Sequence, residues 1–394
     1  MSTTKTQKKK SQTQNKTTKY QYIYEKSKEI ITLHQKEFKK LKDIFNNINF
    51  LYRLVDEKTN HKKLYQTISS YPSYLIWDET KKIIIDSLTK NKPEEPYIYK
   101  QYEYSFNNVI GAGTITFYST IKYRNDIDKI IQKIIRIIGF YVIYTTNQLY
   151  LPDITIYYID NNKTLSETET ELESENRVIG KDVINSAFKN NNEIVIYRNE
   201  ELFKLLTHEL IHYYNIDSFI KEDHKVSNSL LNIYNITIEQ KRKELKVYEA
   251  YTEAIATILN IIFSTKLITV DNLYKEIVFS LKQNAKLFNY FGIKDSRDIY
   301  RKPALFKQTT AAFEYHYLKA KFLLNFNHLL ELIRINTDNN DTNTVNLNLK
   351  IPKISTQDYI RLLGKDRDFD MVLNNIMKTH SSGLDRNMRM TITE

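Results

Sequence analysis

Apolar residues near the start of the chain recur at helical spacing among lysine and glutamate. The recurring positions are Ile31, Phe38, Leu41, Phe45, Ile48 and Tyr52. This spacing places their side chains on one face of a helix. We therefore predict a helical N-terminal region over residues 21–96, with a break at Tyr71–Pro72.

The pattern changes to alternation from about residue 97. Aromatic residues occupy every second position of residues 102–106, and residues 114–118 are mostly β-branched or aromatic. Such segments are typical of strands with one buried face. We predict two strands here, with a turn near Gly111 and Gly113.

A helix and two further strands are predicted next. The helix begins after Asn125–Asp126 and carries a wide isoleucine stripe suited to backing a sheet. The strands are expected over residues 151–159 and 193–197.

The segment after residue 197 predicts the start of a strong helix. Asn199 is expected to cap it, and Glu200 and Glu201 are expected in its first turn, where the helix dipole favours acids. Apolar spacing predicts two more long helices, over about 238–264 and 303–334.

Composition restricts the chemistry available. The 394 residues include no cysteine, which excludes disulfides, zinc fingers, iron–sulfur clusters and cysteine nucleophiles. The 7 glycines form no phosphate-binding loop. A transition-metal site must therefore use carboxylates and some of the 8 histidines.

The net charge of +11 lies largely in one segment, because residues 1–20 carry six lysines and no acid. A tail of lysine, threonine, glutamine and serine cannot bury enough apolar surface to fold, so we predict that it is disordered. Weak nucleic-acid contact is a second role for it. The alternating glutamates of residues 167–175 are interpreted as a solvated loop.

No apolar segment follows the basic N-terminus, and no run of 18 apolar residues occurs. The nearest approach, residues 134–144, is short and contains Arg136. We expect a soluble intracellular protein without a membrane span.

The sequence His208–Glu209–Leu210–Ile211–His212 carries the chemistry. Histidines at i and i+4 lie on one helix face, so both can bind one metal ion. Zinc would lower the pKa of a water and polarise a peptide carbonyl, and Glu209 beside it would be the general base. The plain alternative is two surface histidines with a salt-bridging glutamate.

A catalytic zinc needs a third protein ligand. The extended motif HExxHxxGxxH is absent, because Asn215 and Ser218 stand at its glycine and last histidine. His224, Asp217 and Asp223 lie in a charged connection and are expected to be exposed.

Glu249 and Glu253 are better candidates, because they share one face of a helix rich in alanine and isoleucine. Carboxylates on an inward face need a partner. One of the two can bind the metal while the other accepts a hydrogen bond from a ligand histidine.

HExxH followed by a downstream helix with ExxxE resembles the gluzincin branch of zinc metallopeptidases. The resemblance implies that His208, His212 and Glu249 bind Zn²⁺, that Glu209 is the general base, and that Glu253 orients His208. The connection between His212 and Glu249 is longer than in well-known members.

The same resemblance implies a tyrosine or histidine that hydrogen-bonds the developing oxyanion. Tyr315 and His316, in the segment after Thr309–Thr310, are the candidates.

A narrower resemblance covers about residues 100–330. Its most specific segments are VINSAF at 183–188, EIVIYRNEELFKLLTHELIHYYNID and EAYTEAIATILN. They are similar to uncharacterised predicted metallopeptidases of large cytoplasmic DNA viruses. This implies a viral protein of the host cytoplasm or virion.

The predicted fold is α+β and zincin-like, with a small twisted mixed sheet and an active-site helix above a helical lower lobe. We expect a basic tail (1–20), a helical region (21–96), a catalytic domain (97–270) and a helical C-terminal region with a mixed cap (271–394). The strand at 193–197 is expected to line the cleft.

The leading hypothesis is a zinc-dependent metallopeptidase acting on proteins or peptides. One alternative is a catalytically inactive zincin-fold protein with a virion or interaction role. Another is a nucleic-acid-associated protein that acts through residues 1–20.

Overall fold

The computed structural model describes most of the chain. The described residues are 3–47, 52–56, 97–106, 111–123, 125–144, 150–158, 160, 162–165, 177–218, 224–234, 236–238, 244–301, 305–327, 334–335, 349–350, 355–379 and 386–393. The alternating glutamates at 167–175 and the Tyr71–Pro72 break lie outside these ranges.

A six-stranded mixed sheet forms one half of the molecule, in the order β1-β2-β3-β4-β6-β5. The strands are β1 (Tyr52–Asp56), β2 (Tyr97–Phe106), β3 (Gly113–Thr120), β4 (Asp153–Tyr158), β5 (Ala187–Asn190) and β6 (Glu193–Ile196). Pairs β3–β4 and β4–β6 are parallel, and the other neighbours are antiparallel. The expected α+β class with a small mixed sheet is confirmed.

The alternation predicted for β2 is confirmed, because Tyr102, Tyr104 and Phe106 are all buried. Tyr104 pairs with Gly113, and its ring occupies the place of a Cβ there, so this position requires glycine. Helix α3 (Ile127–Tyr144) carries the predicted isoleucine stripe, whose members are buried in the same core as the strands.

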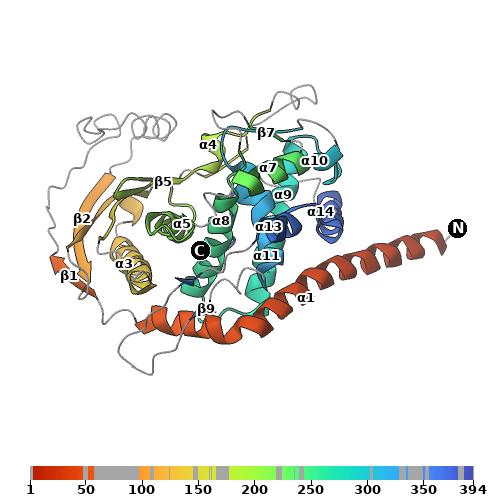
Figure 1. Cartoon of the computed structure of the whole chain (residues 1–394). Coiled ribbons are helices and arrows are strands. Elements are labelled where there is room, and N and C mark those ends of the chain that lie inside the picture. Colours follow the sequence, from red (N-terminus) through yellow and green to blue (C-terminus); the bar gives the residue numbers. More distant parts are fainter. Residues whose placement is uncertain are drawn as a thin grey trace.

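Helix α5 (Leu202–Tyr213) lies between the sheet and helix α8 (Val247–Ser264), and it packs against both α3 and α8 (Figure 1). The capping prediction is wrong. The N-cap is Glu201, in a left-handed conformation, and Asn199 instead donates hydrogen bonds to Tyr123 and Asp160. Glu200 and Glu201 precede the helix and are buried.

Helices dominate the other half of the molecule (Figure 1). They are α7 (His224–Ile233), α8, α9 (Val270–Tyr290), α10 (Asp298–Arg301), a π-helical turn (Glu314–Leu318), α11 (Lys319–Leu324), α13 (Thr356–Leu363) and α14 (Arg367–Thr379). Short elements complete the described fold: a 3-10 turn (Ile121–Tyr123), α4 (Lys181–Ile184), and the pairs β7 (Ile236–Ile238) with β8 (Phe306–Gln308) and β9 (Arg334–Ile335) with β10 (Leu349–Lys350).

Two predicted helices begin later than expected. The helix expected from 238 begins at Val247, because residues 236–238 pair with β8. The helix expected over 303–334 begins only after β8, with the π-helical turn and α11, and residues 328–333 of its expected range lie outside the described residues. Strand pairing over long sequence separations overrides the local helical spacing at both sites.

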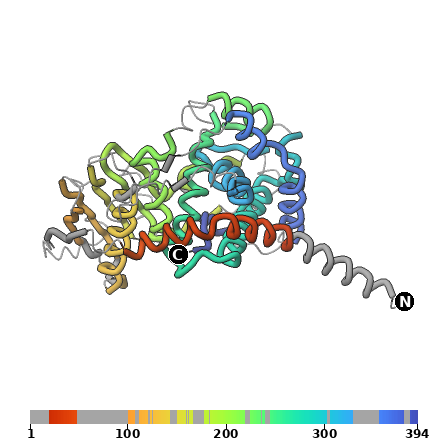
Figure 2. Tube along the Cα trace, turned by 60° about the horizontal axis from the view of Figure 1, so that its bottom comes forward, coloured from red at the N-terminus to blue at the C-terminus, as the bar shows by residue number. Residues whose placement is uncertain are grey.

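Helix α1 (Thr3–Asn47) crosses both halves of the molecule, in contact with α3, α8, α9 and α11 (Figure 2). Its buried face includes the predicted Ile31, Phe38, Leu41 and Phe45. The structure differs from the expected disordered tail, since the helix starts at Thr3. The physical reason is that residues 3–47 contain no proline or glycine, while lysine and glutamine favour helices.

The strand β1 follows α1 within the region expected to be helical. None of the helices in the described ranges combines enough length and apolar character to cross a membrane.

Candidate metal centre

Three side chains from two helices converge at the interface of α5 and α8. The Nε2 atoms of His208 and His212 lie 3.0 Å apart, and Oε2 of Glu249 lies 3.3 Å from each of them. The histidines are one turn apart on α5, as their spacing predicted, and Glu249 comes from the first turn of α8. Among the described residues, these three side chains are potential ligands close enough to one another to share a metal ion.

The separations fit a tetrahedral zinc ion. Ligand bonds of about 2.0–2.2 Å keep the ligand atoms of such an ion roughly 3.4 Å apart. Two imidazole nitrogens and one carboxylate oxygen are also ligand types that zinc accepts, with a fourth position left for water. The residues present therefore fit the metal.

Each histidine has an acidic partner on its other ring nitrogen. Nδ1 of His208 lies 3.0 Å from Oε2 of Glu253, and Nδ1 of His212 lies 2.7 Å from Oδ2 of Asp217. A proton held on Nδ1 by a carboxylate leaves Nε2 free to bind a metal. Glu253 thus occupies the position expected for it.

Asp217 was not expected at the site, because its charged surroundings suggested exposure. Its side chain is fully buried, just beyond the end of α5. The sequence signal for this contact is the position of Asp217, five residues after His212. The chain turns back there through Asn215, which has a positive φ, and this turn brings Asp217 to His212. His224, by contrast, is exposed and pairs with Glu244.

The cluster favours positive charge at its centre. Burial opposes protonation of His212, but Glu249 and Asp217 outweigh it and raise its pKa to about 10. The pKa of His208 is also raised, by Glu249 and Glu253 against the effect of burial. The two histidines lower the pKa of Glu249 well below its ordinary value despite burial. Either a proton or a metal cation satisfies this demand.

Glu209 is buried beside the cluster, with 7 % of its surface exposed. Burial raises its pKa, and the neighbouring Glu249 adds to the effect, while His208 and His212 oppose it. A carboxyl with a raised pKa takes up a proton more readily than an ordinary glutamate, as a general base must.

Tyr315 also reaches the cluster. Its hydroxyl donates a hydrogen bond of 3.0 Å to Oε2 of Glu249, and its ring lies edge-on to His208. It belongs to the π-helical turn Glu314–Leu318, and π turns inside helices are frequent at functional sites.

His316, the other oxyanion candidate, lies outside the three-ligand group. It is buried near Lys319 and Lys163, and no hydrogen-bond partner among the described residues reaches its Nε2. Burial lowers its pKa to about 3, and the two lysines add to the effect.

His316 is expected to make the protein acid-sensitive. Its folded-state pKa of about 3 lies below its ordinary 6.5, so only the unfolded chain binds this proton between those values. The free energy of unfolding should therefore fall as the pH drops from 6.5, by about 1.4 kcal/mol per pH unit from this group. Urea unfolding between pH 7 and 5 should show a shallower loss in His316→Gln, whereas His224→Gln should follow the parent. Equal slopes for His316→Gln and parent would exclude this role.

Asp217→Asn is expected to weaken zinc binding 10–100-fold, because His212 loses the carboxylate that holds its Nδ1 proton. Competition with a chromophoric chelator at pH 7 measures this dissociation constant. Asp271→Asn, at an exposed pair with Lys275, is the matched control and should leave it unchanged. An unchanged constant in Asp217→Asn would show that Asp217 does not orient the ligand.

The strand expected to line the cleft is an inner strand. Strand β6 pairs with β4 on one side and with β5 on the other. Strand β5 is the edge of the described sheet on this side, with β1 at the opposite edge, and β5 lies against α5. Residues 193–196 therefore form an inner strand, because the turn at Asn191 folds β5 onto the outer side of β6. That residues 193–197 line the cleft stays a prediction.

Comparison with known proteins shows a distant similarity to a viral protein. An uncharacterised protein of Acanthamoeba polyphaga mimivirus is 24% identical over 212 residues, which cover 50% of this chain and 51% of that protein. The chain thus spans about half the length of this relative. No protein-family model and no solved structure matches the chain. The similarity links the chain to a viral protein.

Proposed function

We propose that the protein is a zinc-dependent metallopeptidase with a zincin-like, gluzincin-type catalytic site. The observation that carries the proposal is the convergence of His208, His212 and Glu249, with ligand atoms within 4.8 Å of one another. Acidic partners on both histidines and the buried Glu209 add to it.

The ligands, Glu209 and Tyr315 have separate roles in the proposed reaction. A zinc ion held by the three ligands would lower the pKa of a water and polarise the substrate carbonyl. Glu209 takes the proton from the attacking water and delivers it to the leaving amine. The Tyr315 hydroxyl, 3.0 Å from the ligand oxygen of Glu249, is close enough to donate a hydrogen bond to the developing oxyanion.

An extended peptide is the substrate that best suits this arrangement. Strand β5 has one neighbour among the described strands, and an edge strand can pair with an extended chain through backbone hydrogen bonds. Because β5 lies against α5, a paired peptide would pass close to the two histidines.

Cleavage of a peptide library, together with metal analysis of the purified protein, tests the proposal. We expect one zinc per chain, hydrolysis of a subset of peptides, and loss of hydrolysis with a chelator that zinc restores. Bound zinc without cleavage would support the alternative of an inactive zincin-fold interaction protein with a virion role.

Nucleic-acid contact through residues 1–20 is an independent proposal. Helix α1 projects from the body of the molecule at its N-terminal end (Figure 1), and this stretch carries six lysines. Binding should fall steeply with salt and be lost when residues 1–20 are deleted. Unchanged affinity after the deletion would exclude it.

A further inference from the structure

Lys204 is a buried lysine one helical turn before His208. Its side chain is 1% exposed, and its Nζ lies 2.5 Å from Oε1 of Glu253. The other oxygen of the same carboxylate, Oε2, lies 3.0 Å from Nδ1 of His208. Lys204, Glu253 and His208 therefore form a continuous chain of contacts that ends at a metal ligand.

The far side of Lys204 meets the C-terminal segment, residues 386–393. Its Nζ lies 3.4 Å from Sδ of Met390. Glu201, at the start of α5, accepts the backbone N–H groups of Met390 at 2.6 Å and of Thr391 at 2.5 Å. Glu201 adopts φ 62, a left-handed conformation unusual for a residue other than glycine, which indicates that this contact is built into the fold.

The C-terminal segment is held along its whole length by buried side chains of other elements. Lys286 donates to the carbonyl of Asn387, Gln283 to that of Arg389, Lys319 to that of Met390, and Asn260 to that of Thr393. Glu276 accepts the N–H of Ile392. These contacts come from α8, α9 and α11, so three helices fix the position of the segment.

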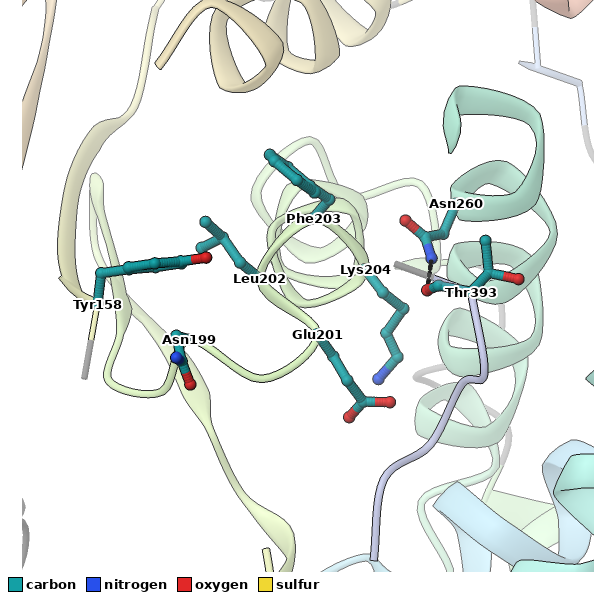
Figure 3. A pocket seen from close by; sticks show the side chains of 8 residues that line it. All are labelled: Tyr158, Asn199, Glu201, Leu202, Phe203, Lys204, Asn260 and Thr393. Carbon is teal, nitrogen blue, oxygen red and sulfur yellow. Dashed lines mark hydrogen bonds between the residues drawn. The ribbon is translucent and has the colours of Figure 1, made fainter. Parts of the chain in front are cut away.

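Figure 3 shows the end of the C-terminal segment, at Thr393. A pocket of about 90 Å³ separates the start of α5 from α8, and Lys204, Glu201, Asn260 and Thr393 line part of it. Lys204 and Glu201 extend to the same side of α5 (Figure 3). Asn260 donates a 2.7 Å hydrogen bond to the backbone carbonyl of Thr393.

The charges in this region balance. The described residues around the segment include three lysines and three glutamates with at most 2% exposure. They are Lys163, Lys204, Lys319, Glu201, Glu253 and Glu276. Removing one partner from a buried charge pair leaves an uncompensated charge, which is strongly destabilising for that group. The place of Lys204 is therefore set by Glu253 on one side and the segment on the other.

We propose that Lys204, held in place by residues 386–393, is a positioning residue that fixes Glu253 against His208 and thereby sets the affinity of the site for zinc. The proposal rests on the zinc site of the proposed function. Without Lys204, Oε1 of Glu253 loses the cation that lies 2.5 Å from it, so the carboxylate can turn away from His208. The His208 ring then loses the acceptor that fixes its metal-binding nitrogen.

The test is the zinc dissociation constant of the full chain, measured by chelator competition together with the thermal stability of the metal-free protein. We expect Lys204→Met to weaken zinc binding about 10–100-fold, the cost typical of losing an outer partner. Lys321→Met is the matched control. Lys321 is also fully buried, but it donates to the Gly364 carbonyl and stacks on aromatic rings away from Glu253. It should lower the unfolding temperature and keep the parent zinc affinity.

Parent affinity in Lys204→Met, or an equal loss in both variants, would overturn the proposal. If Lys204→Met does not fold, Lys204→Gln keeps a hydrogen-bond donor without the charge and should weaken zinc in the same direction. Failure of the peptidase proposal is separable, because a parent that binds zinc but cleaves no peptide still permits this measurement. A parent that binds no zinc would overturn both.

Discussion

Replacing Glu209 with glutamine is expected to reduce kcat/KM for peptide cleavage at least 100-fold while the bound zinc stays. The amide has nearly the shape of the carboxylate but cannot accept a proton from water, and general-base catalysis contributes roughly 10²–10⁴-fold. Because the ligand atoms belong to His208, His212 and Glu249, the metal should remain at one per chain. Initial rates and metal analysis of the same preparation measure both quantities.

Glu193→Gln is the matched control for this experiment. Glu193 lies on β6, where its carboxylate accepts a hydrogen bond from Thr155, and it is not one of the three ligands. The control should keep the parent rate. If Glu209→Gln cleaves as fast as the parent, Glu209 is not the base and the proposed mechanism is wrong.

Glu249→Ala is expected to remove stoichiometric zinc and, with it, hydrolysis. The substitution takes away the oxygen that lies 3.3 Å from both histidine nitrogens. The loss of affinity should exceed the 10–100-fold that an outer partner costs, because a direct ligand is lost. Metal content after gel filtration and chelator competition measure it.

Glu244→Ala provides the control, since Glu244 pairs with the exposed His224 near the start of the same helix. It should retain one zinc per chain. If Glu249→Ala keeps its zinc, the third ligand must come from Glu253 or Asp217, which already contact the two histidines.

Local spacing predicted much of the α5 and α8 contribution to the site. Histidines at i and i+4 share a helix face in any α-helix, so the proximity of His208 and His212 follows from the helix alone. The same rule placed Glu249 and Glu253 on one face of α8. Their different partners, the ligand nitrogens for Glu249 and Nδ1 of His208 for Glu253, depend on how α8 crosses α5.

Local sequence patterns gave wrong predictions where side chains bond to segments that are distant in the chain. Asn199, Glu200 and Glu201 look like a helix cap and first turn, but the C-terminal segment recruits both glutamates. These contacts join residues 187 and 189 positions apart, which no short-range pattern can encode. Strand β5 escaped prediction because its four residues are too few to show a period.

By itself, the sequence determined helices α3 and α5, the main strands, the absence of thiol chemistry and the pair of histidines, because each depends on composition or on spacing within one element. Only the tertiary structure decided which carboxylate faces the histidine pair, that Asp217 is buried against His212 and Lys204 against Glu253, and that β5 is an edge strand of the sheet. Those features depend on the packing of elements distant in the chain, where burial and charge balance select the partners.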